Sequence, residues 1–104
     1  MRNDIIAEIK TARDEAQTKV NAYKYLTSER YNYWRAVSAV MTYDEALDMF
    51  EWGTEHRIPN MATTAHADFG YARDSDATEW TLAFTDGRRD ALASVVDLMD
   101  GRAK

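Results

Sequence analysis

The chain has 104 residues, 45% of them hydrophobic, with a formal net charge of −5 and no cysteine. This length and apolar content predict one globular domain over residues 1–104, with a core of its own rather than a disordered chain. The lack of cysteine excludes disulfide scaffolds, thiolate nucleophiles and cysteine-ligated zinc. No stretch approaches the roughly 20 apolar residues of a membrane-spanning helix, and no signal peptide is evident, so we expect a cytoplasmic protein.

Charge is distributed unevenly along the sequence. Residues 1–42 hold seven Lys or Arg against five Asp or Glu, whereas residues 43–104 hold six against thirteen. The acidic C-terminal part repels nucleic-acid phosphate and favours protein partners with a basic surface.

Residues 3–41 contain neither Gly nor Pro and predict a long helical segment. Its apolar residues recur in steps of three and four, which predicts a heptad-like seam. The seam consists of Ile5, Ile9, Ala12, Ala16, Tyr23, Leu26, Tyr33, Val37 and Val40. A single helix would span about 55 Å, too long for a domain of this size to cover. We therefore favour a break or kink within residues 26–29, with a second copy covering the overhang as the alternative.

Residues 42–56 predict the next helix. Thr42 and Glu45 have the spacing of a capping box, and Gly53 stands where a left-handed C-terminal residue belongs. The Ile-Pro pair at 58–59 is expected to end the helical part of the chain.

Residues 66–85 predict a β-hairpin. Trp80, Leu82 and Phe84 alternate with more polar residues, as in a half-buried strand, and residues 73–76 are polar turn material.

A final helix is predicted over residues 87–100, capped by Asp86. Its apolar face consists of Leu92, Val95, Val96 and Met99. The predicted fold is therefore α+β: a long N-terminal helix or helical hairpin, a third helix, a β-hairpin and a C-terminal helix.

Motifs for catalysis, metal binding or cofactor binding are not evident. His56 and His66 do not match a recurring metal-site spacing, and no serine stands in a nucleophile motif. The four glycines are isolated, so no phosphate-binding loop is formed. We expect a protein that is not an enzyme and that takes no cofactor and no metal.

A basic stripe would run beside the seam if residues 4–41 formed one helix. It consists of Lys10, Arg13, Lys24, Tyr31 and Arg35. Such a stripe can contact phosphate backbone and stack a base, so a nucleic-acid-binding accessory protein is the alternative function. The stripe splits if the helix breaks near residue 27.

The interpretation we favour is a small, non-enzymatic protein-binding module. Acidic side chains would steer it to a basic surface on a host protein and aromatic side chains would anchor it, as in a phage-type inhibitor that acts by occlusion. The expected partner-binding residues are Tyr25, Tyr31, Trp52, Asp44, Asp48, Glu51 and Glu55. A second alternative is a self-assembling structural helical module, for instance a homodimer joined along the N-terminal helix.

Overall fold

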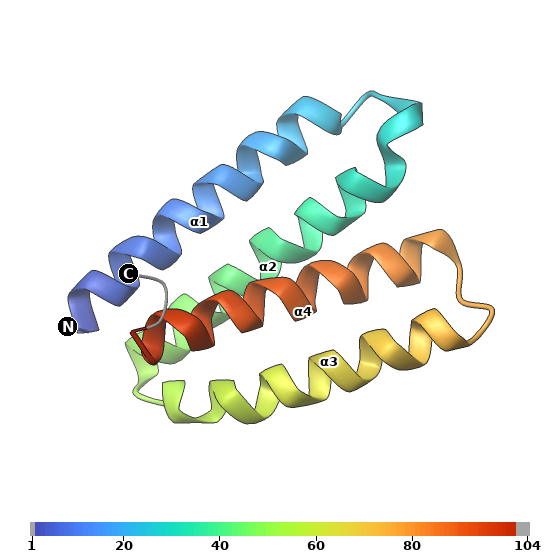
Figure 1. The fold of residues 1–104 in the computed structure, drawn as a ribbon. Helices are drawn as coiled ribbons and strands as arrows, with labels where there is room; N and C mark the ends of the chain where they lie inside the picture. Colours follow the sequence, from blue (N-terminus) through green and yellow to red (C-terminus); the bar gives the residue numbers. More distant parts are fainter. Residues whose placement is uncertain (1, 102–104) are drawn as a thin grey trace.

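The computed structural model describes residues 2–101, and each regular element in that range is helical (Figure 1). In chain order the elements are α1 (Arg2–Tyr23), the 3-10 turn η1 (Thr27–Glu29), α2 (Arg30–Trp52), the 3-10 turn η2 (Glu55–Arg57), α3 (Ile58–Asp74) and α4 (Glu79–Met99). The predicted α+β fold is wrong, because the described part of the chain is an all-helical bundle without strands.

The four helices lie side by side in the order α1, α2, α4, α3 (Figure 1). The central helix α2 packs on both α1 and α4, and α4 packs in turn on α3. Contact between α1 and α4 is slight. The fold therefore resembles a curved layer of helices more than a closed four-helix bundle, and both sides of α2 remain partly accessible.

The hydrophobic core joins all four helices. Ile9 of α1, Phe50 of α2, Ile58 at the start of α3, and Leu92 and Val95 of α4 are between 0 and 3% exposed. They come from the first half of α1 and α3 and from the second half of α2 and α4, so the core lies toward one end of the bundle. Alanine supplies seven of the fourteen buried hydrophobic residues in the described chain, which lets the helix backbones approach closely.

A close helix crossing joins α2 and α4. The buried Ser38 hydroxyl donates a hydrogen bond to the Phe84 carbonyl oxygen across the crossing, at 2.6 Å. One turn further along α4, Gly87 packs on the backbone of Arg35: a Cβ atom placed there would lie 2.2 Å from the Arg35 carbonyl oxygen. This close approach is the reason that position 87 needs glycine, because the position otherwise lies within a regular helix.

The hairpin predicted over residues 66–85 is wrong. The first part of this segment is the end of α3, and α4 already begins at Glu79. Thr78, rather than the predicted Asp86, caps α4: its hydroxyl oxygen accepts a hydrogen bond from the Thr81 amide. Trp80 and Phe84, which suggested a strand, stack on each other as residues one helical turn apart.

Two predicted helix boundaries in the middle of the chain are also wrong. Thr42 does not begin a helix; it lies inside α2, where its buried hydroxyl donates to the Ser38 carbonyl oxygen at 2.8 Å. Pro59 does not end the helical part; it occupies the first turn of α3, where a missing amide proton leaves no helix hydrogen bond unmade.

Other boundaries are confirmed. The break favoured within residues 26–29 is present, because α1 ends at Tyr23 and α2 begins at Arg30. Gly53 ends α2 in the left-handed conformation, with φ 76°, and its amide donates to the Met49 carbonyl oxygen.

Candidate functional site

The most exposed apolar side chains of α2 share one solvent-facing arc. Met41 is 56% exposed and Trp52 is 71% exposed. With about 100° per residue, three helical turns bring Trp52 to within about 20° of Met41. We name this arc the outer face of α2; it consists of Trp34, Met41, Asp44, Glu45, Asp48, Glu51 and Trp52.

Arginines from the two neighbouring helices border the outer face of α2. Arg13 of α1 donates to Asp44 at 3.3 Å, and Arg88 of α4 donates to Glu45 at 2.7 Å. Surface ion pairs of this kind contribute little to stability. Among residues 2–101, Asp48 has no ion-pair partner.

The N-terminal end of the outer face adjoins an aromatic cluster that links α2 to α4. Trp34 contacts Trp80 edge to face, with ring centroids 6.0 Å apart, and Trp80 stacks on Phe84 at 5.0 Å. The guanidinium of Arg30 lies 5.6 Å from the Trp34 ring centroid. Trp80 remains 47% exposed, so the cluster extends the apolar surface from α2 onto α4.

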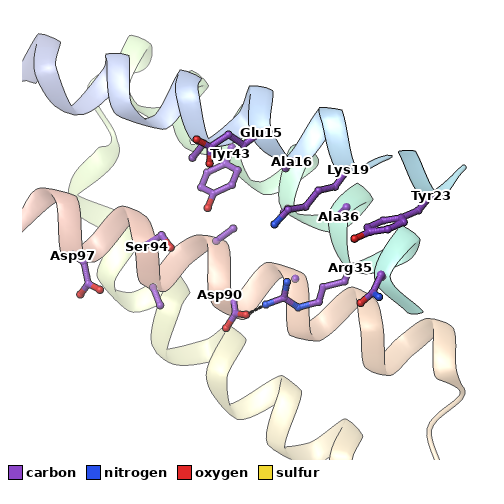
Figure 2. Close-up of a pocket in the computed structure, with 16 residues that line it drawn as sticks. Glu15, Ala16, Lys19, Tyr23, Arg35, Ala36, Tyr43, Asp90, Ser94 and Asp97 are labelled. Carbon is purple, nitrogen blue, oxygen red and sulfur yellow. Dashed lines mark hydrogen bonds and ion pairs between the residues drawn. The ribbon is translucent and has the colours of Figure 1, made fainter. Parts of the chain in front are cut away.

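The opposite side of α2 forms the floor of an open groove of about 500 Å³ between α1 and α4 (Figure 2). Small side chains keep the groove open; they are Ala12, Ala16, Ala36, Ala39, Gly87, Ala91, Ala93 and Ser94. Charged side chains occupy its walls, namely Glu15, Lys19, Arg35, Asp90 and Asp97. Closing the groove would desolvate these charges, which gives a physical reason for the slight contact between α1 and α4.

A polar network ties α2 to α4 beside the groove. The Asp86 carboxylate, 9% exposed as a residue, accepts hydrogen bonds from the Tyr31 hydroxyl at 2.8 Å, Arg35 Nε at 3.1 Å and Arg89 Nη2 at 2.6 Å. Both guanidinium groups also contact Asp90. The two arginines are thus neutralised by the two aspartates within the network.

Tyr31 is expected to titrate late. Desolvation by burial, followed by its hydrogen bond to Asp86, raises the pKa of Tyr31 from its ordinary value near 10 to about 12. Since the folded-state pKa lies above the unfolded one, the contribution of this phenol to stability is present in full below pH 10 and is lost between pH 10 and 12.

Ultraviolet titration of the tyrosines checks this expectation. The curve of the Tyr31→Phe variant should differ from that of the wild type by one phenol with a midpoint near pH 12. A difference centred near pH 10 would show that Tyr31 is not held by Asp86.

Four of the predicted partner-binding residues lie together. Trp52, Asp44, Asp48 and Glu51 all belong to the outer face of α2. Asp44 is the one of these that the structure pairs with an arginine of another helix.

The remaining predicted partner-binding residues lie elsewhere. Glu55 is in η2, where its hydrogen bond from Arg2 holds the pKa of Glu55 below its ordinary value. Tyr25 is 84% exposed in the turn after α1, at the opposite end of α2 from Trp52. Tyr31 is engaged with Asp86 beside the groove. The seven residues therefore do not form one surface.

The residues of the alternative, nucleic-acid interpretation are divided by the break between α1 and α2. Lys10 is exposed on α1, and Lys24 lies in the following turn with its ammonium group over a tyrosine ring. Arg13 is paired with carboxylates on α1 and α2, and Arg35 with carboxylates on α4. These pairs leave the stripe with little uncompensated positive charge.

One functional candidate, Met41, was missed by the sequence, because α2 was divided between two predicted segments, residues 3–41 and 42–56. Continuous numbering of α2 from Arg30 would have placed Met41 in register with Trp52 and Tyr43 on the other side.

Comparison of the chain with protein-family models, curated protein sequences and solved structures finds no match. Among residues 2–101 there is no helix long and apolar enough to cross a membrane. The same residues contain no group of three or more His, Cys, Asp or Glu side chains that could hold a metal ion. The function is therefore inferred from the exposed surfaces alone.

Proposed function

We propose that the chain is a non-enzymatic protein-binding module that contacts its partner through the outer face of α2. The observation that carries the proposal is the alignment of two strongly exposed anchors, Met41 and Trp52, on one helix face with acidic residues between them. Tryptophan is among the residues that dominate interface energetics, at ~2 kcal/mol or more for a central one. Singly exposed apolar residues are common on proteins, whereas aligned ones favour an interface.

The outer face of α2 has the dimensions of a helical docking surface. From Trp34 to Trp52 it covers 18 residue steps, or about 27 Å at 1.5 Å per residue. Apolar side chains lie at both ends, and carboxylates lie in the middle. A partner that matches this pattern carries basic side chains flanked by two apolar contact points.

The carboxylates of the outer face of α2 would contribute mainly to recognition of the partner. Asp48 has no arginine partner within the described chain, so its charge is available for steering a basic surface toward α2. A second copy of this chain would place carboxylate against carboxylate, which disfavours self-association through this face. In the proposed role the module covers a functional basic surface of a cytoplasmic protein and inhibits it by occlusion, as a phage-type inhibitor would.

Affinity purification of the tagged chain from the cell that expresses it tests the proposal. We expect a partner recovered in stoichiometric amount by the wild type. Trp52→Ala should weaken its binding by about 30-fold, because the loss of a tryptophan that anchors an interface costs ~2 kcal/mol. The dissociation constant, measured with the purified partner by calorimetry, gives this ratio directly.

Tyr71→Ser is the matched control. Tyr71 is 83% exposed but lies on α3, away from the outer face of α2. It should leave the affinity unchanged, whereas Asp48→Asn should reduce the association rate at low salt and have less effect at high salt. Equal binding by the wild type and by Trp52→Ala would contradict the proposed surface.

A further inference from the structure

Two arginines of the protein lie against an aromatic ring while a carboxylate holds their charge. The Arg89 guanidinium lies 4.0 Å from the ring centroid of Phe69 and pairs with Asp86 at 2.6 Å. The Arg2 guanidinium lies 5.3 Å from the ring centroid of Phe50 and pairs with a carboxylate of η2. In both places one planar cation contacts an electron-rich ring and an anion at the same time.

The outer face of α2 presents the same two groups without an arginine. Trp52 is 71% exposed, and its ring contacts no cation and no other aromatic ring among residues 2–101. Asp48 is exposed one helical turn earlier, and its carboxylate has no ion-pair or hydrogen-bond partner in the same range. A ring and an anion are therefore both available to a group from outside the chain.

Helix geometry brings these two side chains within reach of one group. Residues four apart on a helix have their Cβ atoms about 5–6 Å from each other. Long side chains on a helix lean toward its N-terminal end, so the Trp52 indole leans toward the turn that carries Asp48. A cation that lies on the indole is therefore close enough to pair with the Asp48 carboxylate.

The other carboxylates in the middle of the outer face are already engaged. Asp44 accepts a hydrogen bond from Arg13 of α1, and Glu45 accepts one from Arg88 of α4. A cation from a partner would have to displace one of these arginines, whereas at Asp48 it displaces only water. Charge complementarity therefore directs a basic partner to the half of the outer face that carries Asp48.

Arginine fits this pair of groups better than lysine does. Its guanidinium is planar, so one face can stack on the indole while N–H groups on its edge donate to the carboxylate. A lysine ammonium is a point charge without a flat face. Glu51, next to Trp52 and also exposed, adds negative charge beside the pair and attracts either cation. The pair therefore favours a cation, and among cations the planar one.

We propose that Trp52 and Asp48 together bind one arginine side chain on the surface of the partner protein. This inference rests on the proposed function and adds the residue that the partner presents to the C-terminal half of the outer face of α2. Met41 lies 11 residue steps, or about 16 Å, away along the helix and meets a different part of the partner. The arginine is thus one contact of a larger interface.

Chemical-shift titration of the labelled chain with three capped peptides, at constant ionic strength, tests the site. The probes are acetyl-Gly-Arg-Gly-amide, its lysine counterpart, and its citrulline counterpart, which keeps the planar shape without the charge. The arginine peptide should shift the Trp52 indole and Asp48 amide resonances, the lysine peptide should shift them about half as much, and the citrulline peptide should not shift them. The Trp34 indole, which Arg30 already contacts, is an internal reference and should move little.

Two substitutions and a matched control make the test specific. Asp48→Asn should weaken binding of the arginine peptide by about threefold, as the loss of an exposed ion pair does. Trp52→Ala, followed at the Asp48 amide, should weaken it by a similar factor and abolish the preference for arginine over lysine. Asp68→Asn removes the same charge from an exposed position on α3 and should change nothing.

Two results would overturn the proposal. The first is an equal response to the citrulline and arginine peptides, which would show that charge plays no part. The second is a response that Asp48→Asn leaves unchanged, or one as strong for lysine as for arginine, which would show that the ring and the carboxylate do not act together. Either result leaves the outer face of α2 as an apolar contact surface, whereas equal partner binding by the wild type and Trp52→Ala removes the surface itself. The failure of this inference is thus distinguishable from the failure of the proposed function.

Discussion

Gly87→Ala is expected to destabilise the protein by about 2 kcal/mol. The added Cβ would lie 2.2 Å from the Arg35 carbonyl oxygen and 3.0 Å from Ser38 Cβ, so α2 and α4 must move apart. Overpacking of this kind costs up to about 3 kcal/mol, and the better helix propensity of alanine offsets about 1 kcal/mol of it. Urea denaturation gives the difference in the free energy of unfolding, and the midpoint of thermal unfolding should fall by about 10 °C.

Gly70→Ala is the matched control for Gly87→Ala. Gly70 also lies inside a helix, α3, but a Cβ placed there meets no atom within 4 Å. Its replacement should stabilise the protein by about 1 kcal/mol, so the two substitutions should have opposite signs. The same stabilising sign at both positions would mean that α2 and α4 separate at no cost and that the close crossing is not a fixed feature of the fold.

The same crossing explains why the strand prediction failed. Trp80, Leu82 and Phe84 alternate, but Trp80 and Phe84 are also one helical turn apart, as are Ala83 and Gly87 on the side packed against α2. A window of six residues fits both periods. Asp86 and Gly87 were then assigned to the start of the final helix, although Gly87 is needed for close packing and Asp86 for the polar network. Both requirements arise from contacts between distant segments, which the local sequence does not contain.

Helix boundaries were predictable where the backbone itself determines them. Gly53 was assigned correctly because a left-handed residue at a helix end has a local chemical signature. Thr42 and Pro59 were misassigned because the local sequence allows two positions for each residue. Thr is favoured at a helix start but is tolerated inside a helix, and Pro can follow the end of a helix or begin the next one. Thr42 satisfies its hydroxyl within α2, and Pro59 begins a helix instead of ending one.

The candidate surfaces were predictable in part. Trp52 and Asp48 were chosen from a helical pattern within residues 42–56, and both lie on one face because residues 42–52 belong to α2. Tyr31 was chosen as an exposed ring, but its hydroxyl binds Asp86 on a helix 55 residues away. A pairing over that sequence separation depends on the packing of α2 against α4, which the misassigned strand concealed.

Asp86→Ala is expected to destabilise the protein by about 2 kcal/mol. The substitution removes the acceptor of three hydrogen bonds and leaves the Tyr31 hydroxyl without a partner beside the groove. Breaking a fully buried ion pair costs about 3–5 kcal/mol. The value here is smaller because Arg35 and Arg89 are partly exposed and keep their contacts with Asp90. Urea denaturation at neutral pH measures the change.

Asp74→Ala is the matched control for Asp86→Ala. Asp74 also accepts a hydrogen bond from an arginine, Arg73, but both side chains are more than 60% exposed, so the change in stability should stay within about 0.5 kcal/mol. The destabilisation caused by Asp86→Ala should also extend to α3, because the Arg89 guanidinium lies 4.0 Å from the ring centroid of Phe69 in α3. Amide hydrogen exchange in α3 should then rise in Asp86→Ala and remain unchanged in Asp74→Ala. If the two variants were equally stable, Asp90 alone would suffice to hold both arginines, and the network would be a surface feature rather than a link between α2, α4 and α3.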